Sequence, residues 1–309
     1  MLSDHPFEVP RHLIEKAQKL PAVEMAVAGA DHPVALESAK QATEAGFIIP
    51  TLIGDKGDIE RIARDLGWDI TGIRIIQSKP EDHAADAAVQ LASANEVQAL
   101  MKGQLHTDSI MRAVVSRDAG LRTDRRISHV FHMTAPKSDK VLMITDGAVN
   151  VAPDEKTLLH IVQNSVDLAH ALGYEMPKVA MLSGSESVIE SMPSTVLARK
   201  IVERANTGEV EGAYVDGPFG FDNAVSPEAA KLKGIGGPVA GHADVLVAPN
   251  IEMGNGLFKM LVYFRSALAA GVVLGAKVPV VLTSRADPPE ARFAACAIAQ
   301  LRAAYDASV

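Results

Sequence analysis

Short apolar runs alternate with stretches of helical periodicity along most of this chain, and the alternation limits the folds open to it. In the first half we expect, in order, a helix at 10–20, a strand at 23–29, a helix at 33–46, a strand at 47–53, a helix at 58–66, a strand at 70–76 and a helix at 80–101. Strands and helices that alternate through short connections are typical of a parallel sheet covered by helices on both faces. The sequence therefore predicts an α/β fold.

The same alternation continues through the second half of the chain. Strands are expected at 127–133, 140–145, 179–182, 212–215 and 243–248, and helices at 153–172, 193–206, 222–231, 253–268 and 288–305. The terminal helix is expected to pack across the first part of the fold.

Net charge and hydropathy limit which kinds of molecule or membrane this chain can bind. The formal net charge of −8 argues against nucleic acid or an anionic membrane surface as a partner. The first residues, MLSDHPFEVPRH, lack the apolar core of a signal peptide. The most apolar segment, 267–282, is interrupted by glycines, Lys277 and Pro279, and is too short to span a bilayer. A cytoplasmic protein with no membrane or nucleic-acid partner is expected.

The single cysteine, Cys296, excludes an intrachain disulfide and a metal site built from several cysteines. It lies in the alanine-rich helical pattern ARFAACAIAQLRAA. That pattern favours a thiol buried in the core, with a catalytic nucleophile as the alternative. No metal ligand set is predicted.

Polar side chains directly follow the apolar run at 278–282. They are Thr283, Ser284, Arg285 and Asp287. In open α/β sheets, ligands bind at the carboxyl ends of the strands. The order of these residues therefore predicts that hydroxyls, a guanidinium and a carboxylate face a ligand there.

Two other segments are candidates for binding an anion. The loop at 183–187 follows an expected strand, and its small residues, Ser183 and Ser185 among them, leave backbone N–H groups open to a phosphate or a pantetheine chain. An ordinary serine-glycine loop is the alternative. Arg112 is one of several arginines between residues 102 and 126, for which a phosphate contact and a solvated helix face both remain open.

A set of spaced motifs in one order resembles the phosphate acetyl/butyryltransferase family, whose members move an acyl group between phosphate and coenzyme A. The resemblance is densest between residues 215 and 287 and extends more loosely back to residue 33. The residues that carry it are Asp216-Gly217-Pro218, Pro238-Val239-Ala240-Gly241, Ala243-Asp244-Val245-Leu246, Gly254-Asn255, Lys259 and Thr283-Ser284-Arg285.

The resemblance implies two α/β lobes with a cleft between them, in an architecture like that of isocitrate and isopropylmalate dehydrogenases. Residues 1–140 with 272–309 would form the first lobe, and residues 141–271 the second, which would also carry a homodimer interface. The segment Asp146–Asn150 would mark the junction of the lobes, or would simply be a turn capped by its own Asp and Asn. Some relatives carry an additional N-terminal domain, for which we expect no room here.

The resemblance also implies roles for particular residues. Arg285 would hold the phosphoryl group, with Arg112 as a second cation, and Ser284 would hydrogen-bond the thiol or the developing oxyanion. The family opens a helix with a Thr-rich loop followed by a basic residue, a pattern that Thr107, Ser109 and Arg112 fit. Thr283, Ser183 and Ser185 are further substrate-binding candidates.

The resemblance also makes Asn255 and Lys259 candidates for binding substrate, and because they are one helical turn apart they share a face. The alternatives are a helix-capping role for Asn255 and a surface position for Lys259.

One part of the family's pattern is absent. Acetyl-type members have an aspartate, implicated as the base, a few residues after the Ser-Arg pair, and Ala291 falls near that place here. The nearest carboxylates are Asp287 and Glu290, and Asp287 has the alternative role of capping the terminal helix. The continuation Ser-Arg-Ala-Asp is more similar to butyryl-type relatives. The base and the acyl chain length are therefore open.

The implied activity is reversible transfer of a short acyl group, acetyl or butyryl, by direct attack of the coenzyme A thiolate on acyl phosphate in a ternary complex. This reaction needs no metal, no permanently bound cofactor and no covalent enzyme intermediate, and coenzyme A is a substrate. A metal- and NAD-dependent decarboxylating dehydrogenase is one alternative, although the cluster of carboxylates that it needs was not found. A regulator that binds coenzyme A or acyl phosphate without turnover is the other.

Overall fold

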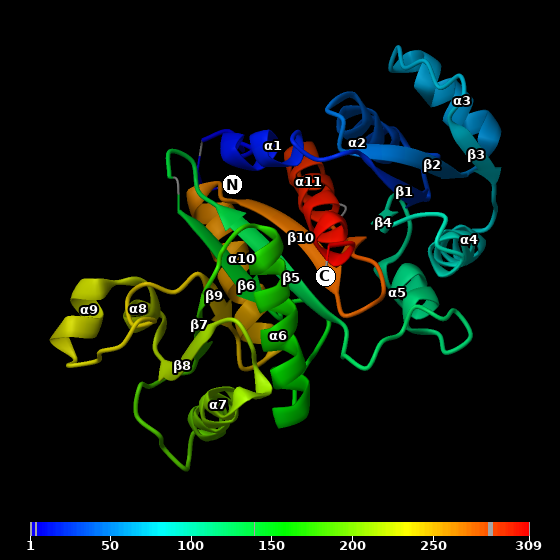
Figure 1. Ribbon diagram of the computed structural model, residues 1–309. Coiled ribbons are helices and arrows are strands. Elements are labelled where there is room, and N and C mark those ends of the chain that lie inside the picture. The colour runs from blue at the N-terminus through cyan, green and yellow to red at the C-terminus, as the bar shows by residue number, and fades with distance from the viewer. Residues whose placement is uncertain (1, 4, 139, 284–286, 309) are drawn as a thin grey trace. The chain divides into compact units, whose positions relative to one another are not determined.

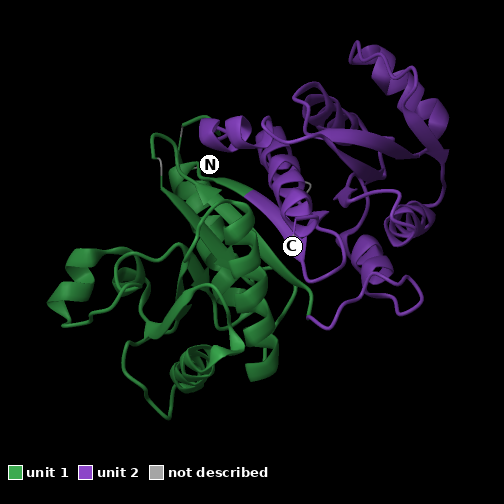
Figure 2. Ribbon diagram, viewed as in Figure 1, with its two compact units in different colours: residues 1–7, 126–269 green, residues 8–125, 270–309 purple. Residues whose placement is uncertain are grey.

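The computed structural model describes residues 2–3, 5–138, 140–283 and 287–308 (Figure 1). Contacts divide the chain into two compact units, coloured in Figure 2: unit 1 comprises residues 1–7 and 126–269, and unit 2 comprises residues 8–125 and 270–309. Residues 126–140 belong to unit 1, whereas the sequence analysis assigned them to the other lobe. They belong there because the strand β5 (Ser128–Thr134) pairs with β6 (Val141–Thr145), with residues 130–134 beside residues 141–145.

The sheet of unit 2 has the strand order β3-β2-β1-β4-β11-β10. All neighbouring pairs are parallel except β10 with β11. Its central strands are apolar and buried along nearly their whole length, as expected for strands that helices cover on both faces. The strands are β1 (Val23–Ala28), β2 (Ile48–Gly54), β3 (Arg74–Gln77), β4 (Ala99–Lys102), β10 (Leu268–Leu274), which begins in unit 1, and β11 (Val280–Val281).

The helices of unit 2 are α1 (Arg11–Ala17), α2 (Pro33–Glu44), α3 (Lys56–Asp65), α4 (Glu81–Ser93), α5 (Thr107–Val115) and α11 (Pro289–Asp306). The terminal helix α11 packs on α1, α2 and β11, so the prediction that it covers the first part of the fold is confirmed. Its run of alanines and Cys296 is buried, and burial raises the pKa of the Cys296 thiol to about 12. The position of Cys296 is that of a core residue.

The single helix predicted at 80–101 is wrong. The helix α4 ends at Ser93, Asn95 has a left-handed backbone (φ 58°), and residues 99–102 form the strand β4 between β1 and β11. The alanine-rich run continues the apolar pattern through the break, so periodicity alone does not reveal it. Pairing with two neighbouring strands makes these residues a strand.

The sheet of unit 1 has the order β5-β6-β9-β7-β8, with β5 and β6 antiparallel and the remaining pairs parallel. Its other strands are β7 (Lys178–Leu182), β8 (Tyr214–Phe219) and β9 (Val245–Val247). Its helices are α6 (Glu155–Ala171), α7 (Pro193–Arg204) with a π-helical turn at Ala205–Glu209, α8 (Phe221–Val225), α9 (Pro227–Leu232) and α10 (Ile251–Arg265).

Three expectations for unit 1 are corrected. Asp216-Gly217-Pro218 lies inside β8 and not after it. The helix expected at 222–231 is divided into α8 and α9, because Ser226 caps α9 and Pro227 begins it. The helix expected to reach residue 268 ends at Arg265, where Ser266 adopts a left-handed backbone (φ 48°) before β10 begins.

The core of unit 1 lies between the sheet and its helices. Phe131, Leu182 and Phe219 are buried there, and the ring of Phe258 on α10 stacks on Phe131 with a centroid distance of 3.9 Å. None of the helices in the described residues is both long and apolar enough to cross a membrane.

Candidate functional site

The strands β1, β4 and β11 end at one edge of the unit 2 sheet. They are parallel neighbours, with Ala28 beside Lys102 and Met101 beside Val281. The loop after β4 is hydrogen-bonded to the loop after β1, because the N–H of Gln104 donates to the carbonyl of Gly29 at 2.9 Å. A Cβ at Gly103 would lie 2.3 Å from the carbonyl oxygen of Gly29, so only glycine permits this approach. The edge is therefore built from loops that contact one another directly.

Lys102 shapes the loop that leads from β4 to α5. Its side chain is buried, and Nζ donates to the carbonyls of Leu105 at 3.0 Å and Gly103 at 3.4 Å. A buried ammonium requires such polar contacts, because burial without them is costly. Lys102 was not among the residues predicted from the sequence, although a lysine that closes an apolar strand is a detectable signal.

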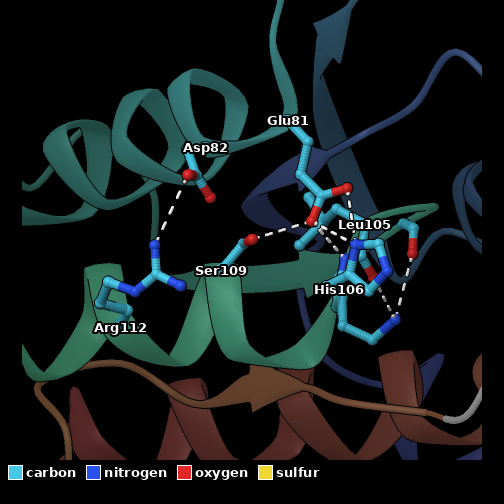
Figure 3. Close-up of polar contacts among 8 residues, drawn as sticks. Glu81, Asp82, Leu105, His106, Ser109 and Arg112 are labelled. Carbon is cyan, nitrogen blue, oxygen red and sulfur yellow. Dashed lines mark hydrogen bonds and ion pairs between the residues drawn. The ribbon is translucent and has the colours of Figure 1, made fainter.

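Glu81 holds the start of α5 (Figure 3). Its Oε1 accepts hydrogen bonds from the backbone N–H of His106 at 2.7 Å and from the hydroxyl of Ser109 at 2.8 Å, and it lies 2.9 Å from Nδ1 of the same histidine. Burial acts to raise the pKa of Glu81, but the hydrogen bonds from His106 and Ser109 outweigh it and hold the pKa below its ordinary value. Glu81 and His106 were not predicted from the sequence, because they are far apart along the chain.

The helix α5 begins at Thr107, where the family pattern expects a helix to open. Thr107 is exposed, and Ser109 is buried against Glu81. Arg112 is 69% exposed, and its Nη1 lies 3.5 Å from Oδ2 of Asp82 on α4. An ion pair this exposed contributes little to stability, so the guanidinium is free to exchange Asp82 for a ligand.

Two of the predicted catalytic residues, Ser284 and Arg285, lie outside the described residues. The residue before them, Thr283, is buried, and its hydroxyl has no hydrogen-bond partner within the described part of the chain. Buried polar groups are almost always hydrogen-bonded, so an unpaired hydroxyl at a strand end requires an explanation, such as a ligand.

Asp287 does not occupy the N-cap position of α11. That position is Pro288, which has no side-chain hydrogen bond to offer, so the capping alternative for Asp287 is wrong. The backbone carbonyl of Asp287 accepts a hydrogen bond from Nη1 of Arg292 at 3.4 Å. Ala291, at the place of the family's aspartate, is buried in the packing of α11.

Arg292 is a buried cation that the sequence analysis missed. Burial lowers the pKa of its guanidinium, against the opposing fields of Asp287 and Cys296. Its signal in the sequence is an arginine inside an otherwise apolar, alanine-rich helix.

The strands β6, β9 and β7 end together at one edge of the unit 1 sheet, with Thr145 and Met181 both beside Val247. Asp146 follows β6 and is buried. Its carboxylate accepts hydrogen bonds from the N–H groups of Ala148 at 2.8 Å and Val149 at 3.0 Å and from the amide of Asn150 at 2.7 Å. The segment 146–150 is thus a turn held by its own Asp and Asn. This was the alternative to a junction of the two lobes.

Asn255 lies in the second turn of α10 and does not cap that helix. The cap is Asn250, whose side chain accepts from the N–H of Met253 at 2.9 Å. Asn255 instead donates from Nδ2 to the carbonyl of Gly147 at 3.1 Å. Lys259, one turn further on, is exposed, with Nζ 6.0 Å from the ring centroid of Phe258.

The serines of the loop after β7 hydrogen-bond within unit 1. The hydroxyl of Ser183 is buried and lies 2.7 Å from that of Ser194 in the first turn of α7. The hydroxyl of Ser185 accepts from the N–H of Ser187 at 3.1 Å. The next helix begins only at Pro193, so this loop does not run directly into a helix N-terminus.

The candidate residues therefore form two groups. Thr107, Arg112, Thr283 and Asp287 belong to unit 2, and Ser183, Ser185, Asn255 and Lys259 belong to unit 1. Within the described ranges, no group of three or more histidine, cysteine, aspartate or glutamate side chains is placed to hold a metal ion.

Comparison with known proteins identifies similar chains over nearly the full length. The family model described as Phosphate acetyl/butaryl transferase matches residues 79–300. The phosphate acetyltransferase of Rhizobium meliloti is 44% identical over 300 residues, which cover 97% of this chain and 94% of the relative. The phosphate butyryltransferase of Clostridium beijerinckii is 39% identical over 292 residues, which cover 94% of this chain and 97% of the relative.

Solved structures agree with these sequence comparisons. A branched-chain phosphotransacylase from Enterococcus faecalis V583 superposes with a TM-score of 0.78 at 32% identity, covering 91% of this chain and 99% of the other. A 4-hydroxythreonine-4-phosphate dehydrogenase from Burkholderia phymatum superposes with a TM-score of 0.55 at 16% identity, covering 91% and 99%. The second likeness shows the fold alone. Together they confirm the α/β architecture that the sequence analysis expected this chain to share with dehydrogenases.

Proposed function

The chain belongs to the phosphate acetyl/butyryltransferase family, and on that premise we propose that it transfers a short acyl group reversibly between coenzyme A and inorganic phosphate. It is an acyltransferase. The observation that carries the proposal is the family match across residues 79–300, which includes both Thr107–Arg112 and Thr283–Asp287. The dehydrogenase alternative is not favoured, because the likeness to that class extends to the fold alone.

The phosphoryl group is assigned to residues of unit 2. Arg285 binds it, since a guanidinium engages two phosphate oxygens at once, and Arg112 is the second cation. The exposure of Arg112 and its weak pairing with Asp82 support this role. Ser284 hydrogen-bonds the thiol or the developing oxyanion, and Thr283 directs its unpaired hydroxyl to the substrate.

Coenzyme A is assigned contacts in unit 1. Lys259 is exposed, which suits an ammonium that binds a phosphate of the nucleotide. The amide oxygen of Asn255 stays available while its nitrogen holds Gly147. The loop with Ser183 and Ser185 binds coenzyme A through its backbone N–H groups, because the two hydroxyls are already hydrogen-bonded within the protein.

The transfer occurs by direct attack of the thiolate on the acyl phosphate in a ternary complex, with no metal and no permanent cofactor. Positioning of the two reactants supplies much of the acceleration, worth up to roughly 7–11 kcal/mol. We further propose that the protein acts in the cytoplasm as a homodimer whose interface lies in unit 1.

The test is thiol release from acetyl-, propionyl- and butyryl-coenzyme A in the presence of phosphate. Arg285→Ala is expected to lower kcat/KM about 10²–10³-fold, as loss of a charge-stabilising donor does elsewhere. The matched control is Arg74→Ala, which removes an exposed arginine of unit 2 paired with Glu96 at 2.6 Å and is expected to keep full activity. The proposal fails if wild type releases no thiol with any of the three substrates.

A further inference from the structure

Formation of acyl-coenzyme A from acyl phosphate requires a group that removes the thiol proton. A thiol has an ordinary pKa of about 8.5, so little thiolate forms at neutral pH without help. The place of the family's aspartate is taken by Ala291, which is buried and carries no titratable group. We propose that His106, oriented by Glu81, is the general base for the coenzyme A thiol, an inference that rests on the acyltransferase function proposed above.

The geometry of the pair is that of an oriented imidazole (Figure 3). Nδ1 of His106 lies 2.9 Å from Oε1 and 3.0 Å from Oε2 of Glu81, and the backbone N–H of the same residue donates to Oε1. An ionised carboxylate only accepts hydrogen bonds, so Nδ1 carries the proton. The lone pair is then on Nε2, the nitrogen that accepts a proton in such carboxylate–histidine pairs.

The ring is both held and accessible. The His106 side chain is 66% exposed, whereas that of Glu81 is 33% exposed. Ser109 donates to the same carboxylate from the first turn of α5, so Glu81 is fixed from two directions. The imidazole therefore has a defined orientation and an open face toward a ligand.

The position of His106 suits the reaction. It stands directly before Thr107, where α5 begins, and less than two turns before Arg112, the second cation assigned to the phosphoryl group. It also ends the loop after β4, whose neighbour β11 leads into Thr283. All of these residues belong to unit 2.

Besides Glu81 itself, charged side chains lie on each of the three elements that carry the pair and its loop. Glu81 and Asp82 come from α4, Asp108 and Arg112 from α5, and Lys102 from β4. Glu81 lies within hydrogen-bond distance of the His106 ring, Asp82 and Arg112 pair with each other, and Lys102 is hydrogen-bonded to the carbonyls of the loop. Histidine side chains titrate near neutral pH, which suits a base for a thiol.

The proposed step balances as follows. The thiol proton moves to Nε2 of His106 while the sulfur electron pair forms a bond to the carbonyl carbon. The bond from that carbon to the phosphate oxygen breaks, and the phosphate leaves with the electron pair. The imidazolium then returns its proton to phosphate or water. In the opposite direction the imidazolium protonates the departing thiolate.

The experiment measures acyl-coenzyme A formation from acetyl phosphate and from butyryl phosphate between pH 6 and 9. His106→Asn keeps an N-cap residue and an amide that can donate to Glu81, but it cannot take up the proton. We expect kcat to fall about 10²–10³-fold near pH 7. The loss should shrink as pH approaches the thiol pKa, the KM for acyl phosphate should stay within about twofold, and added imidazole should restore activity to His106→Ala.

Glu81→Gln provides the second measurement. The amide oxygen still accepts from the His106 N–H and from Ser109, but the negative charge is gone. As the proposed base, His106 is expected to give the wild type an acid limb in its pH profile, and loss of the charge that orients the ring is expected to lower kcat while the KM for acyl phosphate stays unchanged. The control is His83→Ala, which removes an exposed histidine of α4 and should leave the profile unchanged.

The proposal is overturned if His106→Asn keeps the wild-type pH profile, or if Asp287→Asn or Glu290→Gln removes the acid limb instead. A folded His106→Ala variant that imidazole does not restore also contradicts it. An inactive wild type would instead refute the proposed function itself, so the two failures are distinguishable.

Discussion

The contact between Gly254 and Gly147 shows how one residue of the family pattern serves packing. A Cβ at Gly254 would lie 2.4 Å from the carbonyl oxygen of Asp146 and 2.9 Å from Cα of Gly147. The side chain of Asn255 then hydrogen-bonds the carbonyl of Gly147. Gly254 and Asn255 together attach α10 to the turn after β6, so a motif that suggests ligand binding also has a structural role.

Replacement of Gly254 by alanine tests this contact. The new methyl group meets backbone atoms that cannot move aside, so Gly254→Ala is expected to lower the free energy of unfolding by about 1–3 kcal/mol. Gly256→Ala, two residues on in α10 with no atom within 4 Å, should instead raise it by about 0.5–1 kcal/mol. Urea denaturation of both variants measures the difference. Equal effects at the two positions would show that the close approach is not what requires glycine.

At the scale of the element, α3 illustrates a helix cap that doubles as an ion-pair site. The side chain of Asp55 accepts from the N–H of Asp58 at 2.9 Å, and its Oδ2 lies 3.1 Å from Nζ of Lys79. The hydrogen bond from Asp58, followed by those from Lys79 and Gln77, lowers the pKa of Asp55 to about 2. The cap thereby connects α3 to the segment after β3.

This pKa shift predicts a pH-dependent contribution to stability. Because the folded-state pKa is below the unfolded value of about 3.9, the charge stabilises the fold fully above that value and ceases to do so as pH falls through about 2. Asp55→Asn retains a good N-cap but no charge. Urea midpoints measured from pH 6 to 2.5 should show a difference between wild type and variant that is constant above about pH 5 and narrows below pH 4. A difference independent of pH would contradict the assignment.

At the scale of the whole molecule, proteins with the same fold have different functions. A dehydrogenase structure shares the architecture at 16% identity, whereas relatives named as phosphate acyltransferases share 37–44% of their residues with this chain. Function depends on the residues that the sheet edges carry and not on the sheets themselves. The sequence comparisons, and not the fold, therefore decide between the two reaction classes.

The choice between these reaction classes predicts the response to a chelator. Phosphate-dependent thiol release is expected to be unchanged, within about twofold, after dialysis against EDTA, because the transfer as proposed relies on cations of the protein. NAD should not be reduced with any hydroxy acid. Loss of activity in EDTA that added magnesium restores would indicate a metal-assisted reaction instead.

Much of the architecture was predictable from the sequence. The α/β class, most strands and the terminal helix depend on local periodicity, and the polar residues after β11 follow one another directly in the chain. One error arose where the local pattern gives no signal, because β4 is a strand only through its neighbours β1 and β11. The other passed over a local signal, since Ser226 and Pro227 begin the separate helix α9.

The sequence by itself determined the fold class and the family, because periodicity and spaced motifs are properties of the chain. Only the tertiary structure decided which side chains hold one another in place. Glu81 reaches His106 across 25 residues, and Asn255 reaches Gly147 across 108. No local pattern specifies such pairs, since they exist only once the sheet edges bring their loops together.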